Sequence, residues 1–335
     1  MGRKQRVRLI DIAQATGLTV NSVSRALRNG SNISPATRAR VHKVADELGY
    51  IPNQQAQSLR NVRFQVIGVV YDNIINPYYS IVTGNIDALL SERNYRPMVF
   101  FENNIESILS MQTAKEIISF GVSGVISFLT TTKQVAELLE ANGIPLVILG
   151  RNGNDLGVDS VLSNDYRGGK LAGYHLFDSG GKNFAYLGAR HDLPINQLRL
   201  QGFNKALTNN GAIVKHTVNN DKNETVAALL DRLFKADRTI DSIFCFNDLM
   251  AFEVVNYLLL HNKKVPEDIN VIGYDNLQRE IHYPFRLTTI DNDKEITAKI
   301  AIDLIFEKLN NPNNKEITCK IIDVALVAGQ TTTKH

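Results

Sequence analysis

The sequence contains little sulfur and no tryptophan. Its 335 residues include two cysteines and four methionines. Cys245 and Cys319 have no CxxC spacing and lie in apolar, strand-like surroundings, so we expect buried free thiols rather than a disulfide or a metal site. No apolar run approaches the roughly 20 residues of a membrane span, and the N-terminal segment lacks the apolar core of a signal peptide. These absences predict a cytoplasmic protein.

The motifs of common α/β enzymes are also missing. No two glycines are two positions apart, which excludes the dinucleotide-binding G-x-G-x-x-G, and GxxxxGK[ST], HExxH and GxSxG do not occur. The seven histidines are scattered along the chain. We therefore expect no catalytic residues, no metal and no cofactor.

Positive charge is concentrated at the beginning of the chain. Residues 1–63 contain eleven Lys or Arg against three Asp or Glu, a net charge of +8, whereas the whole chain carries +3. The remaining residues therefore carry a net charge of −5. A basic N-terminal module on a mildly acidic body favours a head that binds a polyanion, although a solvated basic tail has the same composition.

The stretch 9–28, LIDIAQATGLTVNSVSRALR, has two short blocks of apolar residues at helical spacing. Between the blocks, Gly17 can adopt the positive φ of a sharp turn and Thr19 can cap a following helix. This pattern predicts two helices joined by a tight turn, and the leading end of the second helix can enter a DNA major groove. An ordinary helical hairpin fits the pattern equally well.

A third helix is predicted for residues 34–49, because Ser-Pro begins it and glycine ends it. The segment 50–61 that follows is mostly polar. Pro52 prevents continuation of the helix, and Asn53 can cap a new one of only about two turns, which is too short to be stable alone. This segment is either a flexible linker or a helix that folds only on a partner, with Leu59 available to wedge into a minor groove.

From residue 64 onward, short β-rich apolar runs alternate with helical stretches. Repeated βα units with apolar strands indicate parallel sheets covered by helices, and the number of strands predicts two such domains side by side. The expected strands are 65–71, 97–101, 124–129, 145–150, 160–163, 184–189, 243–246, 271–274 and 287–290. The expected helices are 80–94, 107–121, 133–143, 168–180, 196–211, 223–235, 249–262 and 295–311.

Polar and aromatic residues collect at the carboxyl ends of these strands, where open α/β sheets bind ligands. Each one alone could be a helix cap or loop residue, which is the favoured interpretation for Asp72, Asp248 and Asn276. Together they suit a small polyol or sugar, because rings stack on C–H faces while forked polar groups bind hydroxyls. The set is Asp72, Asn73, Asn76, Tyr78, Tyr79, Ser127, Phe128, Asn164, Asp165, Arg190, Arg199, Asn247, Asp248, Asp275 and Asn276.

The order of these parts resembles the lactose-repressor (LacI/GalR-type) family of bacterial transcription regulators over essentially the whole chain. In the N-terminal part the resemblance rests on DIAQATGLTVNSVSRAL and SPATRARVHKVADELGYIPNQQAQSL. In the body it rests on IGVV, NPYYS, GVIS, LGRNG, SNDYRGGKLA, LRLQGF, CFNDLMAF and VIGYDN. Each phrase is loose by itself, but their order and spacing are highly specific.

This resemblance implies an all-α helix-turn-helix headpiece and an α/β body of the periplasmic-binding-protein type, built from two doubly wound parallel-sheet lobes. The implied divisions are a headpiece at 1–52, a hinge helix or linker at 53–62, an N-terminal lobe at 63–163 and 291–322, and a C-terminal lobe at 164–290 and 323–335. The chain would cross between the lobes near Ser163, Asp291 and Asp323.

The resemblance also implies a function. A homodimer would bind a near-palindromic operator in double-stranded DNA and repress a carbohydrate-utilisation operon, under allosteric control by a sugar or sugar-derived effector held between the lobes. Base contacts are implied for Val20, Asn21 and Arg25, and phosphate contacts for Thr19, Ser31, Asn32 and Thr37. Minor-groove contacts of the hinge are implied for Asn53, Gln57 and Leu59. Effector contacts are implied for Tyr78, Tyr79, Ser127, Phe128, Arg199, Asn247 and Asp275.

The sequence departs from the family pattern at three points. Gly150 stands where some members place an effector-contacting acid, and Gly329 stands where an arginine is usual. The leucine heptads that tetramerise a few members are absent, which favours a dimer. Two other functions are weighed against a regulator: a solute-binding protein without a regulatory role, disfavoured by the missing signal peptide, and a sugar-processing enzyme, for which no acid/base pair can be placed.

Overall fold

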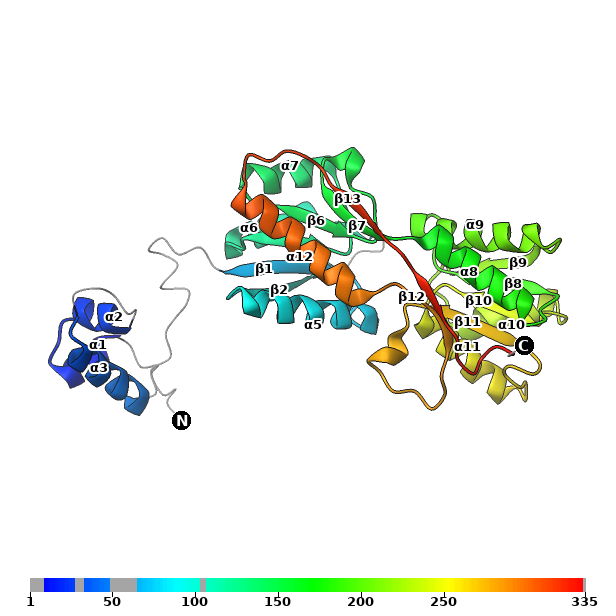
Figure 1. Ribbon diagram of the computed structural model, residues 1–335, viewed down its shortest axis with the longest axis horizontal. Helices are drawn as coiled ribbons and strands as arrows, with labels where there is room; N and C mark the ends of the chain where they lie inside the picture. The colour runs from blue at the N-terminus through cyan, green and yellow to red at the C-terminus, as the bar shows by residue number, and fades with distance from the viewer. Residues whose placement is uncertain (1–8, 28–32, 49–64, 103–106, 334–335) are drawn as a thin grey trace. The chain divides into compact units, whose positions relative to one another are not determined.

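The computed structural model describes residues 9–27, 33–48, 65–102 and 107–333 (Figure 1). The chain divides into two compact units, residues 1–64 and residues 65–335. Across the described residues, each helix is too short or too polar to cross a lipid bilayer.

The first unit contains three helices, α1 (Leu9–Thr16), α2 (Val20–Leu27) and α3 (Pro35–Leu48). Its small core is formed by fully buried Ile12, Val23, Ala26 and Val41, which all three helices contribute. Gly17 adopts the predicted positive φ of 67° between α1 and α2. The tight turn and the helix pair predicted from the sequence are therefore present.

The second unit is built on two six-stranded sheets. The first has the order β13-β7-β6-β4-β1-β2 and is parallel throughout. Its strands are β1 (Val66–Tyr71), β2 (Arg96–Phe101), β4 (Gly124–Ser127), β6 (Leu146–Leu149), β7 (Asp159–Ser163) and β13 (Cys319–Ile322). A separate two-stranded sheet pairs β3 (Ile108–Leu109) with β5 (Thr130–Thr131).

The second sheet has the order β14-β12-β11-β10-β8-β9. It is parallel except for β14, which pairs antiparallel with β12. Its strands are β8 (Phe184–Gly188), β9 (Val214–Asn219), β10 (Ser242–Cys245), β11 (Asn270–Tyr274), β12 (Thr288–Asp291) and β14 (Ala325–Val327).

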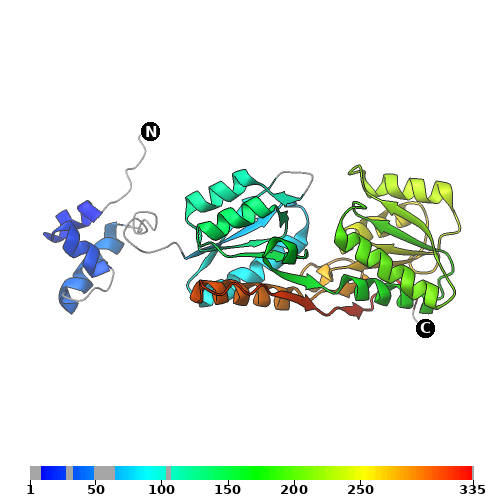
Figure 2. The ribbon, with the colours of Figure 1, turned by 90° about the horizontal axis from the view of Figure 1, so that it is seen from above.

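Helices cover both faces of each sheet (Figure 2), and each sheet accordingly has two hydrophobic clusters, one on either side. The first sheet with α5 (Pro77–Glu92), α6 (Met111–Phe120), α7 (Lys133–Ala141) and α12 (Lys294–Asn310) is the N-terminal lobe. The second sheet with α8 (Asp165–Asp178), α9 (Pro194–Asn209), α10 (Val226–Ala236) and α11 (Asp248–Leu260) is the C-terminal lobe. Two 3₁₀ turns complete the unit, η1 (Asn154–Leu156) and η2 (Leu277–Arg279).

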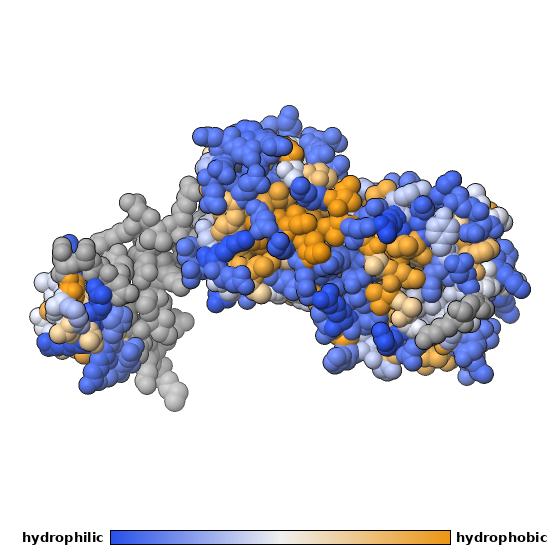
Figure 3. Space-filling view, viewed as in Figure 1, coloured by the Kyte–Doolittle hydropathy of each residue, from blue (hydrophilic) through white to orange (hydrophobic). Residues whose placement is uncertain are grey.

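The chain passes between the lobes three times. It leaves the first sheet after β7, returns between β12 and α12, and crosses again between β13 and β14, the red strands of Figure 1. Figure 3 shows apolar residues gathered over α12 and β13 of the N-terminal lobe, where Ile296 and Ile321 are exposed.

Three expectations from the sequence were wrong. Strands β9, β13 and β14 were not predicted: all three are edge strands, β9 is mostly polar, and β13 and β14 have only four and three residues. The helix expected from residue 107 begins later, after the N-cap Ser110. Cys245 is buried, but Cys319 is only partly buried because it lies on the edge strand β13.

Candidate functional site

Helix α2 presents the side chains predicted to contact bases. Asn21 and Arg25 are exposed, and Val20 is 40% exposed. The hydroxyl of Thr19 accepts a hydrogen bond from the Ser22 N–H at 3.1 Å and so caps the helix. Val20 and Asn21 thus stand in the first turn of α2 and Arg25 in its last turn, all three accessible to a partner.

The residues predicted to contact phosphates lie at helix starts where they are described. Thr37 donates its N–H to the hydroxyl of Ser34 at 3.2 Å, and the two hydroxyls are 2.8 Å apart at the start of α3. Five of the predicted DNA contacts lie outside the described residues: Ser31, Asn32, Asn53, Gln57 and Leu59.

An aromatic cluster stands at the carboxyl ends of β1 and β4 in the N-terminal lobe. Tyr79 stacks on Tyr71 with ring centroids 5.4 Å apart, and it meets Phe128 edge to face at 4.9 Å. The ring centroids of Tyr78 and Phe128 are 6.1 Å apart. Both tyrosines belong to the first turn of α5, where Asn76 accepts a hydrogen bond from the Tyr78 N–H and caps the helix.

Arg199 is the buried cation of the C-terminal lobe. Its Nε donates to Asp165 at 2.8 Å, and its Nη1 donates to the carbonyl of Phe246. The guanidinium lies 3.5 Å from the ring centroid of Tyr274, a cation–π contact. Burial is the largest single influence and opposes the charge, but Asp165, Tyr274, Asp275 and Tyr186 together outweigh it, so the pKa of Arg199 is raised and the group stays charged.

Close packing of α8 against α9 places this ion pair. A Cβ added to Gly169 on α8 would lie 2.0 Å from the backbone oxygen of Arg199, and one added to Gly202 on α9 would lie 2.0 Å from the backbone oxygen of Tyr166. The two helix backbones therefore approach more closely than any side chain would allow. Because Asp165 begins α8 and Arg199 lies on α9, this approach brings their side chains together.

A tight turn after β11 carries the buried acid Asp275. Asp275 and Asn276 both have positive φ, 107° and 49°. The ammonium of Lys294, the first residue of α12, donates to the carbonyls of Asp275 at 2.6 Å and Asn276 at 3.3 Å, and Asn292 donates to the Asp275 carboxylate at 3.0 Å. Burial raises the pKa of Asp275 to about 6, although Arg199 and Lys294 lower it.

Asn247 and Asp248, which follow β10, form hydrogen bonds within the C-terminal lobe. Asn247 caps α11 by accepting a hydrogen bond from the Met250 N–H at 2.9 Å. Asp248 is fully buried and accepts from the Leu277 N–H at 2.8 Å and from the Thr289 hydroxyl. The cap expected at Asp248 is therefore made by Asn247, and Asp248 instead holds the turn that carries Asp275.

The structure brings together part of the predicted effector set. Burial raises the pKa of Tyr78, and the charges of Asp275, Arg199 and Asp165 of the other lobe act on that pKa as well. Ser127 is fully buried, and its hydroxyl exchanges hydrogen bonds with the backbone of Leu129. The site thus joins Tyr78, Tyr79 and Phe128 to Arg199 and Asp275, whereas Ser127 and Asn247 bond to nearby backbone.

Sequence reasoning missed several groups of this site. Asp165 was noted at a strand end but not as the partner of Arg199, and Tyr274 was taken only as part of an apolar strand. Nothing in the local sequence distinguishes Lys294 from an ordinary surface lysine, yet it is 2% exposed. Arg151 follows β6 with Gly150 between them, and its place near a strand end could have been noticed in the sequence.

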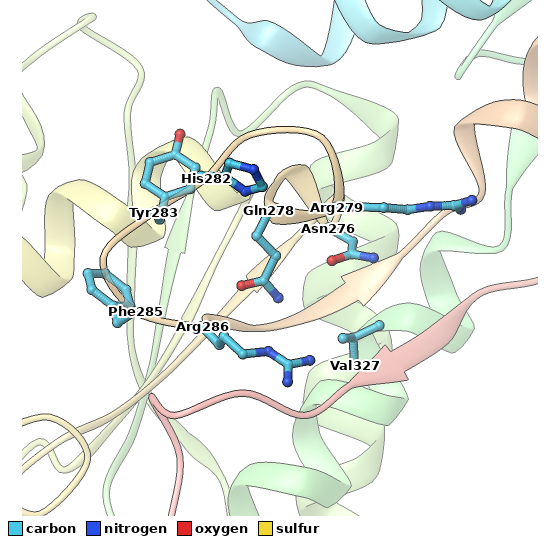
Figure 4. Close-up of a pocket in the computed structure, with 8 residues that line it drawn as sticks. All are labelled: Asn276, Gln278, Arg279, His282, Tyr283, Phe285, Arg286 and Val327. Carbon is cyan, nitrogen blue, oxygen red and sulfur yellow. The ribbon is translucent and has the colours of Figure 1, made fainter.

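A hollow of about 360 Å³ lies against the loop between β11 and β12 (Figure 4). Figure 4 shows Gln278 and Arg286 pointing toward its middle and Arg279 pointing away. Gln278 exchanges two hydrogen bonds with the backbone of Leu287, so this hollow is a surface feature of a well-held loop. Its walls are Asn276, Gln278, Arg279, His282, Tyr283, Phe285, Arg286 and Val327, of which only Asn276 belongs to the polar strand-end set predicted from the sequence.

Comparison with known proteins matches both units. Residues 8–53 match the model of bacterial regulatory proteins of the lacI family, and residues 174–332 match the periplasmic binding protein-like domain. The HTH-type transcriptional repressor PurR of Vibrio parahaemolyticus is 26% identical over 319 residues, which cover 91% of this chain and 93% of that protein.

Solved structures share the fold. A lac repressor dimer bound to operator and the anti-inducer ONPF is 23% identical with a TM-score of 0.81, covering 98% of this chain and 100% of that one. A LacI-family regulator from Enterococcus faecium with bound ribose is 25% identical with a TM-score of 0.69, covering 80% of this chain and 98% of that one. The chain therefore combines a DNA-binding domain of the lacI family of bacterial regulatory proteins with a periplasmic binding protein-like domain, the domain pair of a DNA-binding transcriptional regulator.

Proposed function

We propose that this repressor controls a carbohydrate-utilisation operon and that a sugar or sugar-derived effector binds between the lobes of its body. The proposal is supported by an aromatic cluster at strand ends of one lobe and by buried Arg199 and Asp275 in the other, whose charges act on the pKa of the Tyr78 hydroxyl. Aromatic faces pack on the C–H faces of a sugar ring, while a guanidinium and a carboxylate bind its hydroxyls in forked pairs. The ribose bound by the Enterococcus faecium relative supports this class of ligand.

Binding across the lobes supplies the allosteric mechanism. An effector that touches both lobes favours one orientation of the lobes over others. Lys294 links the two directly, because α12 packs in the N-terminal lobe while the Lys294 ammonium bonds the turn that carries Asp275. A ligand that pulls on Asp275 therefore acts on a helix of the other lobe.

On the DNA side, we assign base contacts to Val20, Asn21 and Arg25 of α2. We also assign phosphate contacts to Thr19, Ser31, Asn32 and Thr37. Minor-groove contacts of the hinge are assigned to Asn53, Gln57 and Leu59. Effector binding would change the spacing of two headpieces, and with it operator affinity.

A homodimer is the assembly that this mechanism requires. Exposed apolar side chains on the edge strand β2, Val99 at 45% and Phe101 at 46%, are consistent with a surface that a second copy covers. Sedimentation of the full chain at micromolar concentration should show a dimer, and a monomer at that concentration would contradict this part of the proposal.

The test of the whole proposal is operator binding in the presence of sugars. DNA upstream of the genes adjacent to this one should be bound with a preference over random duplex at physiological salt, and a sugar should shift that affinity. The sign of the shift distinguishes an inducer from a corepressor. Equal affinity for operator and random duplex would refute sequence-specific control, and the lack of any sugar response would refute the effector assignment.

Arg25→Ala should reduce the sequence specificity of DNA binding, whereas Arg38→Ala should reduce the affinity for all duplexes. If Arg25 donates two hydrogen bonds to one guanine, its loss should weaken operator binding by about 1–3 kcal/mol and relax the preference at that base pair. Arg38 on α3 is expected to act through phosphates, so its loss should weaken binding evenly across sequences and reduce the salt dependence. Fluorescence anisotropy with operator, single-base variants and random duplex separates the two. Identical losses on all duplexes for both variants would contradict the assignment.

The raised pKa of Asp275 predicts two pH dependences. Because the folded pKa of about 6 lies above the ordinary value, this group favours folding most strongly at acid pH, and its contribution is lost as pH rises through about 6. Relative to Asp275→Asn, the wild type should therefore lose about 1 kcal/mol of unfolding free energy between pH 5 and 7.5. Effector affinity should rise over the same interval, because the ionised carboxylate accepts two hydroxyls. If the unfolding free energies of the wild type and of Asp275→Asn change with pH in the same way, the raised pKa of Asp275 is contradicted.

A further inference from the structure

Helix α12 has a largely buried lysine at each end. Lys308, in the last turn, is 16% exposed and donates to the carbonyls of Asn314, at 3.2 Å, and Glu316. A cation is favoured there, because the C-terminal end of a helix carries partial negative charge. Lys294 begins the helix and is 2% exposed, so its charge lies at the end that carries partial positive charge. Burial and the helix dipole both oppose an ammonium at this position, which indicates that its contacts compensate for both.

The contacts of Lys294 lie in the loop that carries Asp275. The ammonium donates to the carbonyls of Asp275 at 2.6 Å and Asn276 at 3.3 Å, and it lies 3.9 Å from the carboxylate of Glu280. This loop follows β11 of the C-terminal lobe, whereas the buried face of α12 packs in the N-terminal lobe. Lys294 therefore joins the first residue of a helix in one lobe to a loop of the other.

The turn that receives these hydrogen bonds has an unfavourable backbone conformation. Asp275 has φ 107° and Asn276 has φ 49°, so two successive residues other than glycine have positive φ. Such residues persist only where surrounding contacts hold them. The carbonyls of both residues accept from Lys294, and the Asp275 carboxylate accepts from Asn292 at 3.0 Å. Lys294 thus bonds the backbone of the two residues whose conformation sets the position of this carboxylate.

We infer that Lys294 is a positioning residue of the effector site: its ammonium holds the strained Asp275–Asn276 turn, and with it the Asp275 carboxylate, against the first turn of α12. Lys294 acts through Asp275 rather than by contact with the effector. This inference rests on the proposed function of Asp275 as an effector contact. It adds that the place and the charge of that carboxylate depend on a lysine of the other lobe.

The charge of Lys294 also acts on the ionisation of Asp275. Burial raises the pKa of Asp275 to about 6, while Arg199 and Lys294 lower it. Loss of the ammonium should therefore raise this pKa, whereas a turn that opens to water would have a lower one. Asp248 accepts from the Leu277 N–H at 2.8 Å and keeps the turn in place, so the carboxyl group stays buried. Other titratable groups act on Asp275 or stand beside Lys294: Arg199, Asp165, Asp248, Tyr78, Tyr79 and Glu280.

Lys294→Met should weaken effector binding by the full chain at least about tenfold at pH 7, because it removes a charged donor and leaves the carboxylate misplaced and partly protonated. Lys308→Met is the matched control. It removes a lysine of the same helix that also bonds two carbonyls and lies 3.7 Å from a carboxylate, that of Asp159. Its effector affinity should stay within about twofold of the wild type. Calorimetric titration with ribose, glucose, fructose and galactose measures both.

A second measurement needs no effector. Urea denaturation between pH 5 and 9 compares each protein with its Asp275→Asn derivative. In the wild type, the stability that Asp275 contributes at acid pH is lost as pH rises through about 6. In Lys294→Met this loss should occur at higher pH, because the folded pKa is higher, and in Lys308→Met it should occur at the wild-type pH. Lys294→Gln, which keeps N–H donors without the charge, gives both readouts if Lys294→Met does not fold.

The results separate this inference from the proposed effector site. If a sugar binds the wild type and Lys294→Met binds it as tightly, or no more weakly than Lys308→Met does, the positioning role is wrong while the effector site stands. If all four sugars fail to bind the wild type, the proposed effector class is wrong, and the pH profile alone decides the role of Lys294. An upward shift confined to the Lys294 variants supports that role, and an unchanged or downward shift overturns it.

Discussion

Gly169→Ala is expected to lower the free energy of unfolding of the body by about 3 kcal/mol. The added Cβ would lie 2.0 Å from the backbone oxygen of Arg199, a contact that no side-chain rotation can relieve. Helices α8 and α9 would have to separate, and Arg199 would be displaced from Asp165. Effector response should therefore weaken together with stability.

Urea denaturation of the full chain measures the loss. Gly84→Ala is the control, because Gly84 also lies in a helix, α5, but has no atom within 4 Å of its added Cβ. That variant should be neutral or up to about 1 kcal/mol more stable, since alanine is the better helix former. Similar midpoints for Gly169→Ala and Gly84→Ala would show that the two helices are not held in backbone contact.

Arg199→Met is expected to destabilise the body by about 3–5 kcal/mol and to abolish the effector response. Arg199 and Asp165 form a buried pair with side chains 6% and 2% exposed, so removing the cation leaves a buried carboxylate without its opposite charge. The carbonyl of Phe246 loses its donor as well. Operator binding without effector should persist, because the headpiece has a core of its own.

Two further variants distinguish charge from packing. Adding Asp165→Asn to Arg199→Met should recover part of the stability but none of the effector response, because the buried charge disappears while the ligand contact is still missing. Arg167→Met breaks the Arg167–Asp323 pair, whose side chains are 51% and 60% exposed, and should cost less than about 1 kcal/mol. If Arg167→Met and Arg199→Met unfold at the same urea concentration, burial does not make the Arg199–Asp165 pair more important for stability than the exposed Arg167–Asp323 pair.

The headpiece was the part most open to prediction from sequence. Its turn depends on one glycine with positive φ and its helices on caps such as Thr19, and both are local effects that act within three residues. The central strands of the body were equally predictable, because each is buried on both faces and must be apolar throughout. The edge strand β9 escaped prediction because one of its faces meets solvent and its pattern depends on the partner strand.

Local sequence therefore determined the helix pair, the alternation of strands and helices and the strand ends at which ligands bind. Tertiary structure decided which strand-end residues find distant partners. Asn247 and Ser127 bond to nearby backbone, whereas Arg199 meets Asp165 across 34 residues and Lys294 meets Asp275 across 19. The physical reason is that a cap or a turn is stabilised by neighbours in the chain, while a buried charge is stable only beside a partner that the packing of helices and sheets brings to it.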